Sequence, residues 1–130
     1  MSYLHRACAA ILLGAAATAL SALPAMADTP LGSYVARLSP QDHFNSAGKR
    51  LSTAAQVVRQ DRANWHRFGY GDPEDEHDPW FSTNNARARF ETMLGRPGAM
   101  NAATRSAILH GSPVVEVLVY PNRVRVEIIY

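Results

Sequence analysis

The C-terminal segment constrains the fold of this chain more than any other stretch. It reads PVVEVLVYPNRVRVEIIY, and on each side of Pro121 and Asn122 valine or isoleucine stands at every second position. Such alternation is typical of β-strands with one buried face, and proline and asparagine are turn residues. The segment therefore predicts an antiparallel hairpin in which Val119 faces Val124 and one face is wholly apolar.

The apolar face of this hairpin needs a cover, because two strands alone are marginally stable in water. Three segments before the hairpin have helical periodicity and end before a glycine. They are Ser52 to Phe68, Asn84 to Leu94 and Ala102 to His110. In the first and longest of them, Trp65 is expected to be the largest anchor in the core.

A third strand is predicted at Tyr34 to Leu38, which reads YVARL. In the hairpin register Glu116 falls opposite Glu127, and like charges across a ladder are destabilising. Arg125, diagonal to Glu116, can compensate in part, and Arg37 is the expected counter-ion from the third strand. The chain is therefore predicted to form an α+β domain, residues 34–130, with about three helices packed on one face of a small antiparallel sheet. The C-terminal hairpin forms that sheet, and YVARL is its candidate third strand.

The N-terminus has the three parts of a secretory signal peptide. Arg6 stands in a short polar head, an alanine- and leucine-rich stretch follows, and a small-x-small site ends at Ala27. We expect residues 1–27 to be removed and residues 28–33 to be a flexible start. The mature protein is then expected in the periplasm or outside the cell, with no membrane anchor after cleavage.

Composition limits what the mature chain can do. Removing 27 of 130 residues leaves 103, enough for one domain with a single core. The only cysteine, Cys8, lies in the leader, so disulfides, thiolate metal sites and cysteine nucleophiles are excluded. Without Arg6, the mature chain keeps 12 of the 13 basic residues and has 11 acidic ones. Its net charge of +1 argues against nucleic-acid binding. No motif calls for a cofactor.

An acidic segment, DPEDEHD, follows the longest predicted helix. One interpretation is that its carboxylates pair with a basic stripe on that helix, formed by Arg59, Arg62 and His66, while Trp80 and Phe81 anchor the segment in the core. The alternative is a Ca²⁺ or Zn²⁺ site, although the spacing matches neither an EF-hand nor a histidine pair on a helix. The candidate metal ligands are Asp72, Glu74, Asp75, Glu76, His77 and Asp78.

A polar segment, QDHFNSAGKRL, precedes the same helix and is rich in side chains that hydrogen-bond to backbone. It is either a loop held by its own hydrogen bonds or part of a shallow groove for anions or carboxylates. The candidate binding residues are His43, Asn45, Arg50, Arg59, Arg62 and His66.

The function predicted from these features is binding. The sequence has no nucleophile elbow and no other motif with a catalytic mechanism behind it. We therefore expect a small exported, non-enzymatic domain that binds a protein or envelope component through the charged surface around residues 42–78. The alternative is a metal-binding or small hydrolytic protein that uses residues 72–78.

Overall fold

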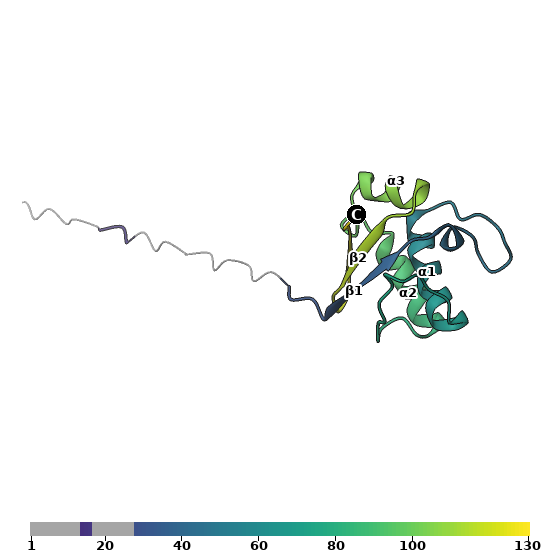
Figure 1. Ribbon diagram of the computed structural model, residues 1–130. Helices are drawn as coiled ribbons and strands as arrows, with labels where there is room; N and C mark the ends of the chain where they lie inside the picture. Colours follow the sequence, from purple (N-terminus) through teal and green to yellow (C-terminus); the bar gives the residue numbers. More distant parts are fainter. Residues whose placement is uncertain (1–13, 17–27) are drawn as a thin grey trace, which may run out of the picture.

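The computed structural model describes residues 14–16 and 28–130 (Figure 1). The predicted signal peptide, residues 1–27, therefore lies outside the described residues except for 14–16. Within the described ranges, no helix has the length and apolarity needed to cross a membrane. The elements in chain order are β1 (Gly32–Arg37), a 3-10 helix η1 (Pro40–His43), α1 (Ala54–Phe68), α2 (Asn84–Leu94), α3 (Ala102–His110), β2 (Val114–Val119) and β3 (Val124–Ile128).

The three strands form one antiparallel sheet in the order β1-β2-β3. Val119 pairs with Val124 and Glu116 with Glu127, so the predicted hairpin register is confirmed. The third strand is also confirmed, since β1 pairs antiparallel with β2 on the side away from β3. It begins at Gly32 and so includes two residues of the predicted flexible start.

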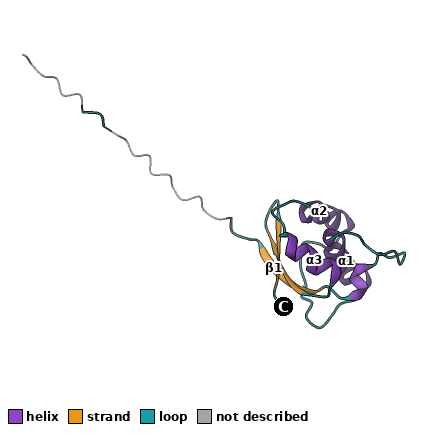
Figure 2. Ribbon diagram, turned by 90° about the horizontal axis from the view of Figure 1, so that it is seen from above, coloured by secondary structure: helices purple, strands orange, loops and turns teal. Residues whose placement is uncertain are grey.

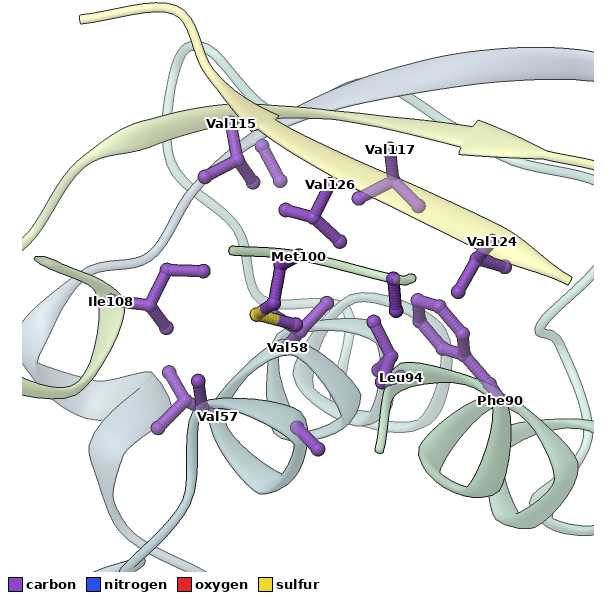
Figure 3. Close-up of a cluster of buried hydrophobic side chains, with 14 of the residues drawn as sticks. Val57, Val58, Phe90, Leu94, Met100, Ile108, Val115, Val117, Val124 and Val126 are labelled. Carbon is purple, nitrogen blue, oxygen red and sulfur yellow. The ribbon is translucent and has the colours of Figure 1, made fainter. Parts of the chain in front are cut away.

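The helices gather on one side of this sheet, as both ribbon views show (Figures 1 and 2). Valines of β2 and β3 point from the sheet toward α1, α2 and α3 (Figure 3). Phe81 and Phe90 belong to this buried core and stack with ring centroids 3.9 Å apart. The predicted α+β architecture is therefore confirmed. The labelled core residues are Val57, Val58, Phe90, Leu94, Met100, Ile108, Val115, Val117, Val124 and Val126.

The first turn of α1 is fixed by a capping box. Thr53 Oγ1 accepts from Gln56 N at 3.2 Å, and Gln56 Oε1 accepts in return from Thr53 N at 3.2 Å. Thr53 is therefore the N-cap of α1, and the helix begins at Ala54, two residues after its predicted start. Gly69 ends the helix as predicted, with a φ of 64° that favours glycine.

The buried face of α1 differs from the predicted one. Val57 and Val58 are fully buried, whereas Trp65 is half-buried and Phe68 is 51% exposed. The last two turns of α1 pack against the acidic segment instead of the sheet, and Trp65 rests on Gly71, where an added Cβ would lie 2.5 Å from the ring. The prediction that Trp65 is the largest core anchor is therefore wrong.

The predicted role of Arg37 is also wrong. Val35, not Arg37, stands opposite Glu116, and Arg37 stands opposite Val114. The Arg37 guanidinium instead pairs with Glu74, with 2.7 Å between Nη2 and Oε1.

Candidate functional site

The acidic segment lies along the free edge of β1. Val35 N donates to Glu76 Oε1 at 2.7 Å, Glu76 N donates to Val35 O at 2.8 Å, and Arg37 N donates to Asp75 Oδ1 at 2.8 Å. An edge strand leaves such N–H groups without partners, and here carboxylates of the acidic segment accept from them. With the Arg37–Glu74 ion pair, these bonds fasten the segment to the sheet.

Arg62 joins α1 to the acidic segment. Its side chain is fully buried; Nε donates to Asp61 Oδ2 at 2.7 Å, and Nη1 donates to Asp78 Oδ1 at 3.0 Å and to Glu76 O at 2.9 Å. The guanidinium also lies over the ring of Tyr34, with Cζ 4.1 Å from the centroid. The buried Arg62 guanidinium thus contacts two carboxylates and the face of an aromatic ring.

Asp78 accepts four hydrogen bonds in this cluster. Oδ1 receives Arg62 Nη1 and lies 2.6 Å from His66 Nε2, while Oδ2 accepts from Trp80 N at 2.9 Å and from Phe81 N at 2.7 Å. Burial alone would raise the pKa of Asp78, but the hydrogen bonds from His66, Phe81 and Arg62 outweigh it, so the pKa lies below its usual value. Asp78 therefore stays ionised and fixes the backbone that carries the two aromatic residues.

Two other groups of the cluster have raised pKa values. Burial raises the pKa of Asp61 well above its ordinary value despite the attraction of Arg62. Burial likewise raises the pKa of Tyr34. Within the described residues, Tyr34 Oη and Arg62 Nη2 have no hydrogen-bond partner. These side chains are buried, and their contacts join α1, β1 and the acidic segment.

The predicted pairing of the acidic segment with the basic stripe is confirmed for two of its three members. Arg62 and His66 both contact Asp78. It is wrong for Arg59, whose Nη1 lies 3.3 Å from Glu91 Oε2 and whose Nη2 donates to Asn84 Oδ1 at 3.3 Å. That guanidinium joins α1 to α2 instead.

Three of the six predicted binding residues are not accessible to a partner, which corrects the expectation. The Arg62 side chain is fully buried, and the His66 side chain is only 7% exposed because it packs against Asp78. His43 is buried with Nδ1 2.9 Å from Ser39 O and Nε2 2.8 Å from Ile108 O. These three residues hold elements of the fold together.

The polar segment before α1 is held in part by its own hydrogen bonds, as the first interpretation of it expects. Asn45 Oδ1 accepts from Ala47 N at 3.0 Å and from Lys49 N at 2.9 Å. Arg50 is exposed, and its backbone bridges to Phe44. Asn45 and Arg59 line one hollow between this segment, α1 and α2, whereas Arg50 lines a different one.

The six candidate metal ligands share one segment but do not form one coordination sphere. Among residues 14–16 and 28–130, no three His, Cys, Asp or Glu side chains gather as they would around a metal ion. Asp75 and Asp78 accept from protein donors, as does Glu76, and His77 places its ring edge-on to His66, with centroids 5.7 Å apart. Asp72 lies at the start of the segment, where its N–H donates to Asp75 Oδ2 at 2.8 Å.

A groove lies where α2, the β2–β3 turn and the approach to β1 meet, and it is the candidate functional site. It consists of two adjoining hollows of about 510 and 520 Å³. Leu31, Trp80 and Met93 contribute large apolar side chains, and Gly32 makes room for the indole, since an added Cβ would lie 2.7 Å from the Trp80 ring. Both hollows are lined by Met93, Arg96, Tyr120, Pro121 and Asn122.

The lining of the groove is cationic. Arg89, Arg96 and Arg123 line it, and Asp28 is the only acidic residue among the described lining residues. Arg123 lies 3.5 Å from Asp28 Oδ2 and stacks on Tyr120, with Cζ 3.7 Å from the ring centroid. In the described part of the chain, Arg89 has no carboxylate partner. Such a surface favours an anionic partner with apolar side chains.

Sequence reasoning missed this groove because its residues come from separate segments that only the fold brings together. Arg96 Nη1 donates to Asn122 O at 2.6 Å, for instance, which links the end of α2 to the hairpin turn. The available signal was two arginines next to apolar residues: Arg89 precedes Phe90 in the predicted second helix, and Arg123 precedes Val124 at the hairpin turn.

Comparison with known proteins gives no relative from which to take a role. No family model matches the chain, and neither a curated protein nor a solved structure matches it.

Proposed function

We propose that the protein is a non-enzymatic domain, exported to the periplasm or the cell exterior, that binds an extended acidic peptide segment of a protein partner in the groove beside α2. The observation that carries this proposal is the set of three arginines facing one carboxylate around an aromatic groove. The proposal moves the binding surface away from residues 42–78, because many of the charged side chains there are engaged within the fold.

The groove supports a peptide better than a compact ligand. Its two hollows adjoin beside α2 and the β2–β3 turn and share lining residues, so together they offer room for more than one side chain of a peptide. Aromatic and arginine side chains such as Trp80, Tyr120 and Arg89 are the types that dominate binding energy at protein interfaces. Cationic side chains beside apolar surface recognise acidic segments that also carry a large apolar residue.

The chemistry of the groove supports binding over catalysis. Besides the arginines, its titratable lining residues are Asp28 and Tyr120, and Asp28 is already near Arg123. General acid–base catalysis needs a titratable group near the working pH within reach of substrate. The buried carboxylates Asp61 and Asp78 have no such access.

Tryptophan fluorescence tests the proposal directly. The chain has two tryptophans, and Trp65→Phe leaves Trp80, which lines the groove, as the only reporter. Titration with the acetylated peptide Glu-Asp-Leu-Phe-Glu-Asp should change its emission in a saturable way that weakens as salt rises. The same peptide with lysine in place of each acidic residue should leave the emission unchanged.

Charge reversal gives the matched control. Arg89→Glu, in the groove, should weaken peptide binding at least tenfold, whereas Arg50→Glu, an exposed arginine outside it, should not. Equal effects of the two variants, or equal binding of the acidic and basic peptides, would exclude the groove as the binding site.

The export part of the proposal rests on the leader sequence and has a separate test. N-terminal sequencing of the exported protein should begin at Asp28. Recovery of a chain that still starts at Met1 in the membrane fraction would contradict cleavage.

A further inference from the structure

The hollow that Asn45 and Arg59 line lies at the seam between α1 and α2, and it shares no lining residue with the groove. Its volume is about 260 Å³. Arg59, Ala63 and Arg67 line it from one face of α1, because residues four apart lie above one another on a helix. Arg87 and Glu91, also four apart, line it from α2.

Three guanidinium groups line this hollow with one carboxylate. Glu91 is that carboxylate, and it is bonded to Arg59 at 3.3 Å. Arg67 has no carboxylate partner within the described residues and lies over Phe68, with Cζ 5.0 Å from the ring centroid. The hollow therefore has a local charge of +2.

Arg87 is the most buried of the three cations. Only 5% of the residue is exposed, and Nη1 donates to Phe81 O at 2.9 Å, a neutral partner. Burial lowers its pKa, and repulsion from Arg59 and Arg67 lowers it further. Guanidinium groups remain charged in proteins, so this repulsion persists in the free protein and an anion would relieve it.

Three of the four amide side chains that line the hollow have spare donors and engaged acceptors, while the fourth, Gln60, donates through Nε2 to Asn64 Oδ1 at 2.8 Å. Asn45 Oδ1 accepts from two backbone N–H groups, Gln56 Oε1 accepts from Ser52 N and Thr53 N, and Asn84 Oδ1 accepts from Arg59. Their NH₂ groups have no partner among the described residues. A wall of N–H donors with net positive charge is the chemistry that holds an oxyanion.

From this geometry we propose that the hollow at the α1–α2 seam binds a phosphate group, either as inorganic phosphate or as a phosphate monoester. Phosphate carries about −1.5 to −2 charge at pH 7, which balances the +2 of the hollow. Its oxygens are strong acceptors that suit both the guanidinium forks and the amide donors. Arg67 and Arg87 are the principal contacts, since Arg59 is already paired with Glu91.

Titration followed by NMR tests the site in the whole protein. Inorganic phosphate should shift the side-chain amide signals of Asn45 and Asn84 along a saturable curve, whereas sodium chloride at the same ionic strength should not. Arg67→Gln should weaken binding at least fivefold. Arg50→Gln is the matched control, because Arg50 is also exposed and also lies over a neighbouring ring, that of Phe44, at 5.7 Å.

The two sources of phosphate are separated by a second titration with glycerol phosphate. Tighter binding of glycerol phosphate than of inorganic phosphate assigns the site to a monoester, and the reverse order assigns it to the free ion. The proposal is overturned if neither binds, if chloride causes the same shifts, or if Arg67→Gln and Arg50→Gln have equal effects. The Trp80 signal in the groove reports the peptide site separately, so failure of one proposal does not imply failure of the other.

Discussion

Replacing Asp78 by alanine should destabilise the protein more than any other change in the acidic segment. The substitution leaves Arg62 fully buried with Asp61 as its remaining carboxylate partner, and it removes the acceptor for Trp80 N and Phe81 N. Breaking a buried ion pair by removing one partner costs about 3–5 kcal/mol. The loss of the two backbone acceptors adds to this cost, so we expect at least about 3 kcal/mol in total.

A loss of this size is large relative to the whole domain. A chain of this length has a free energy of unfolding of roughly 5–15 kcal/mol. With a urea dependence of about 1–3 kcal/mol per molar, the unfolding midpoint of Asp78→Ala should fall by roughly 1–3 M. Urea unfolding followed by circular dichroism measures this shift.

The matched control for Asp78→Ala is Asp72→Ala in the same segment. The Asp72 side chain is half-buried and accepts no hydrogen bond within the described residues, so this change should cost less than about 0.5 kcal/mol. If Asp78→Ala costs less than about 1 kcal/mol, or no more than Asp72→Ala, the Arg62 cluster does not hold the acidic segment in place.

Three further predictions follow from burial and packing. Burial raises the pKa of Asp42 from 3.8 to about 6, so the folded state binds this proton more tightly than the unfolded state. The contribution of Asp42 to stability should therefore fall by up to about 3 kcal/mol as pH rises from 4 to 6. Urea unfolding of Asp42→Asn should show a smaller decline across that range, and the remaining decline should come from groups such as Asp61, whose pKa burial also raises. Gly32→Ala should displace the Trp80 ring, seen as a shifted Trp80 emission in the Trp65→Phe background; an unchanged spectrum would show that the ring does not rest on Gly32. Phe90 is a fully buried core aromatic, so Phe90→Ala should lower the free energy of unfolding by about 3–5 kcal/mol, whereas Trp65→Ala should lower it clearly less. The reverse order in chemical denaturation would restore Trp65 as the main anchor.

The arrangement of helices and strands could be predicted because it follows from local patterns. Alternating valines gave the hairpin and its register, since one face of each strand had to be buried. The starts and ends of α2 and α3 match the predicted ones because capping residues and glycines mark them. These features depend on residues that are close together in the sequence.

The candidate site could not be predicted in the same way, because long-range packing decides which charges remain accessible. Arg59 and Arg62 are three residues apart on α1 and look alike in the sequence, yet Arg59 reaches α2 while Arg62 is buried under Tyr34. The direction in which each side chain points follows from where the acidic segment returns to the sheet. Amphipathic periodicity alone also placed Trp65 in the core, because it cannot show that Asp61 and Arg62 would be buried together.

The order of the strands has a kinetic consequence. The central strand β2 pairs Gly32 to Arg37 of β1 with Val119 to Val114, so strands from opposite ends of the domain must meet before the sheet is complete. Pairing between residues so distant in sequence requires closure of a long loop and makes folding slow. During synthesis β1 leaves the ribosome long before its partner exists, and the helices have no sheet to pack on. Folding to completion must therefore follow synthesis of the final hairpin, and a chain that stops short of residue 114 should not fold.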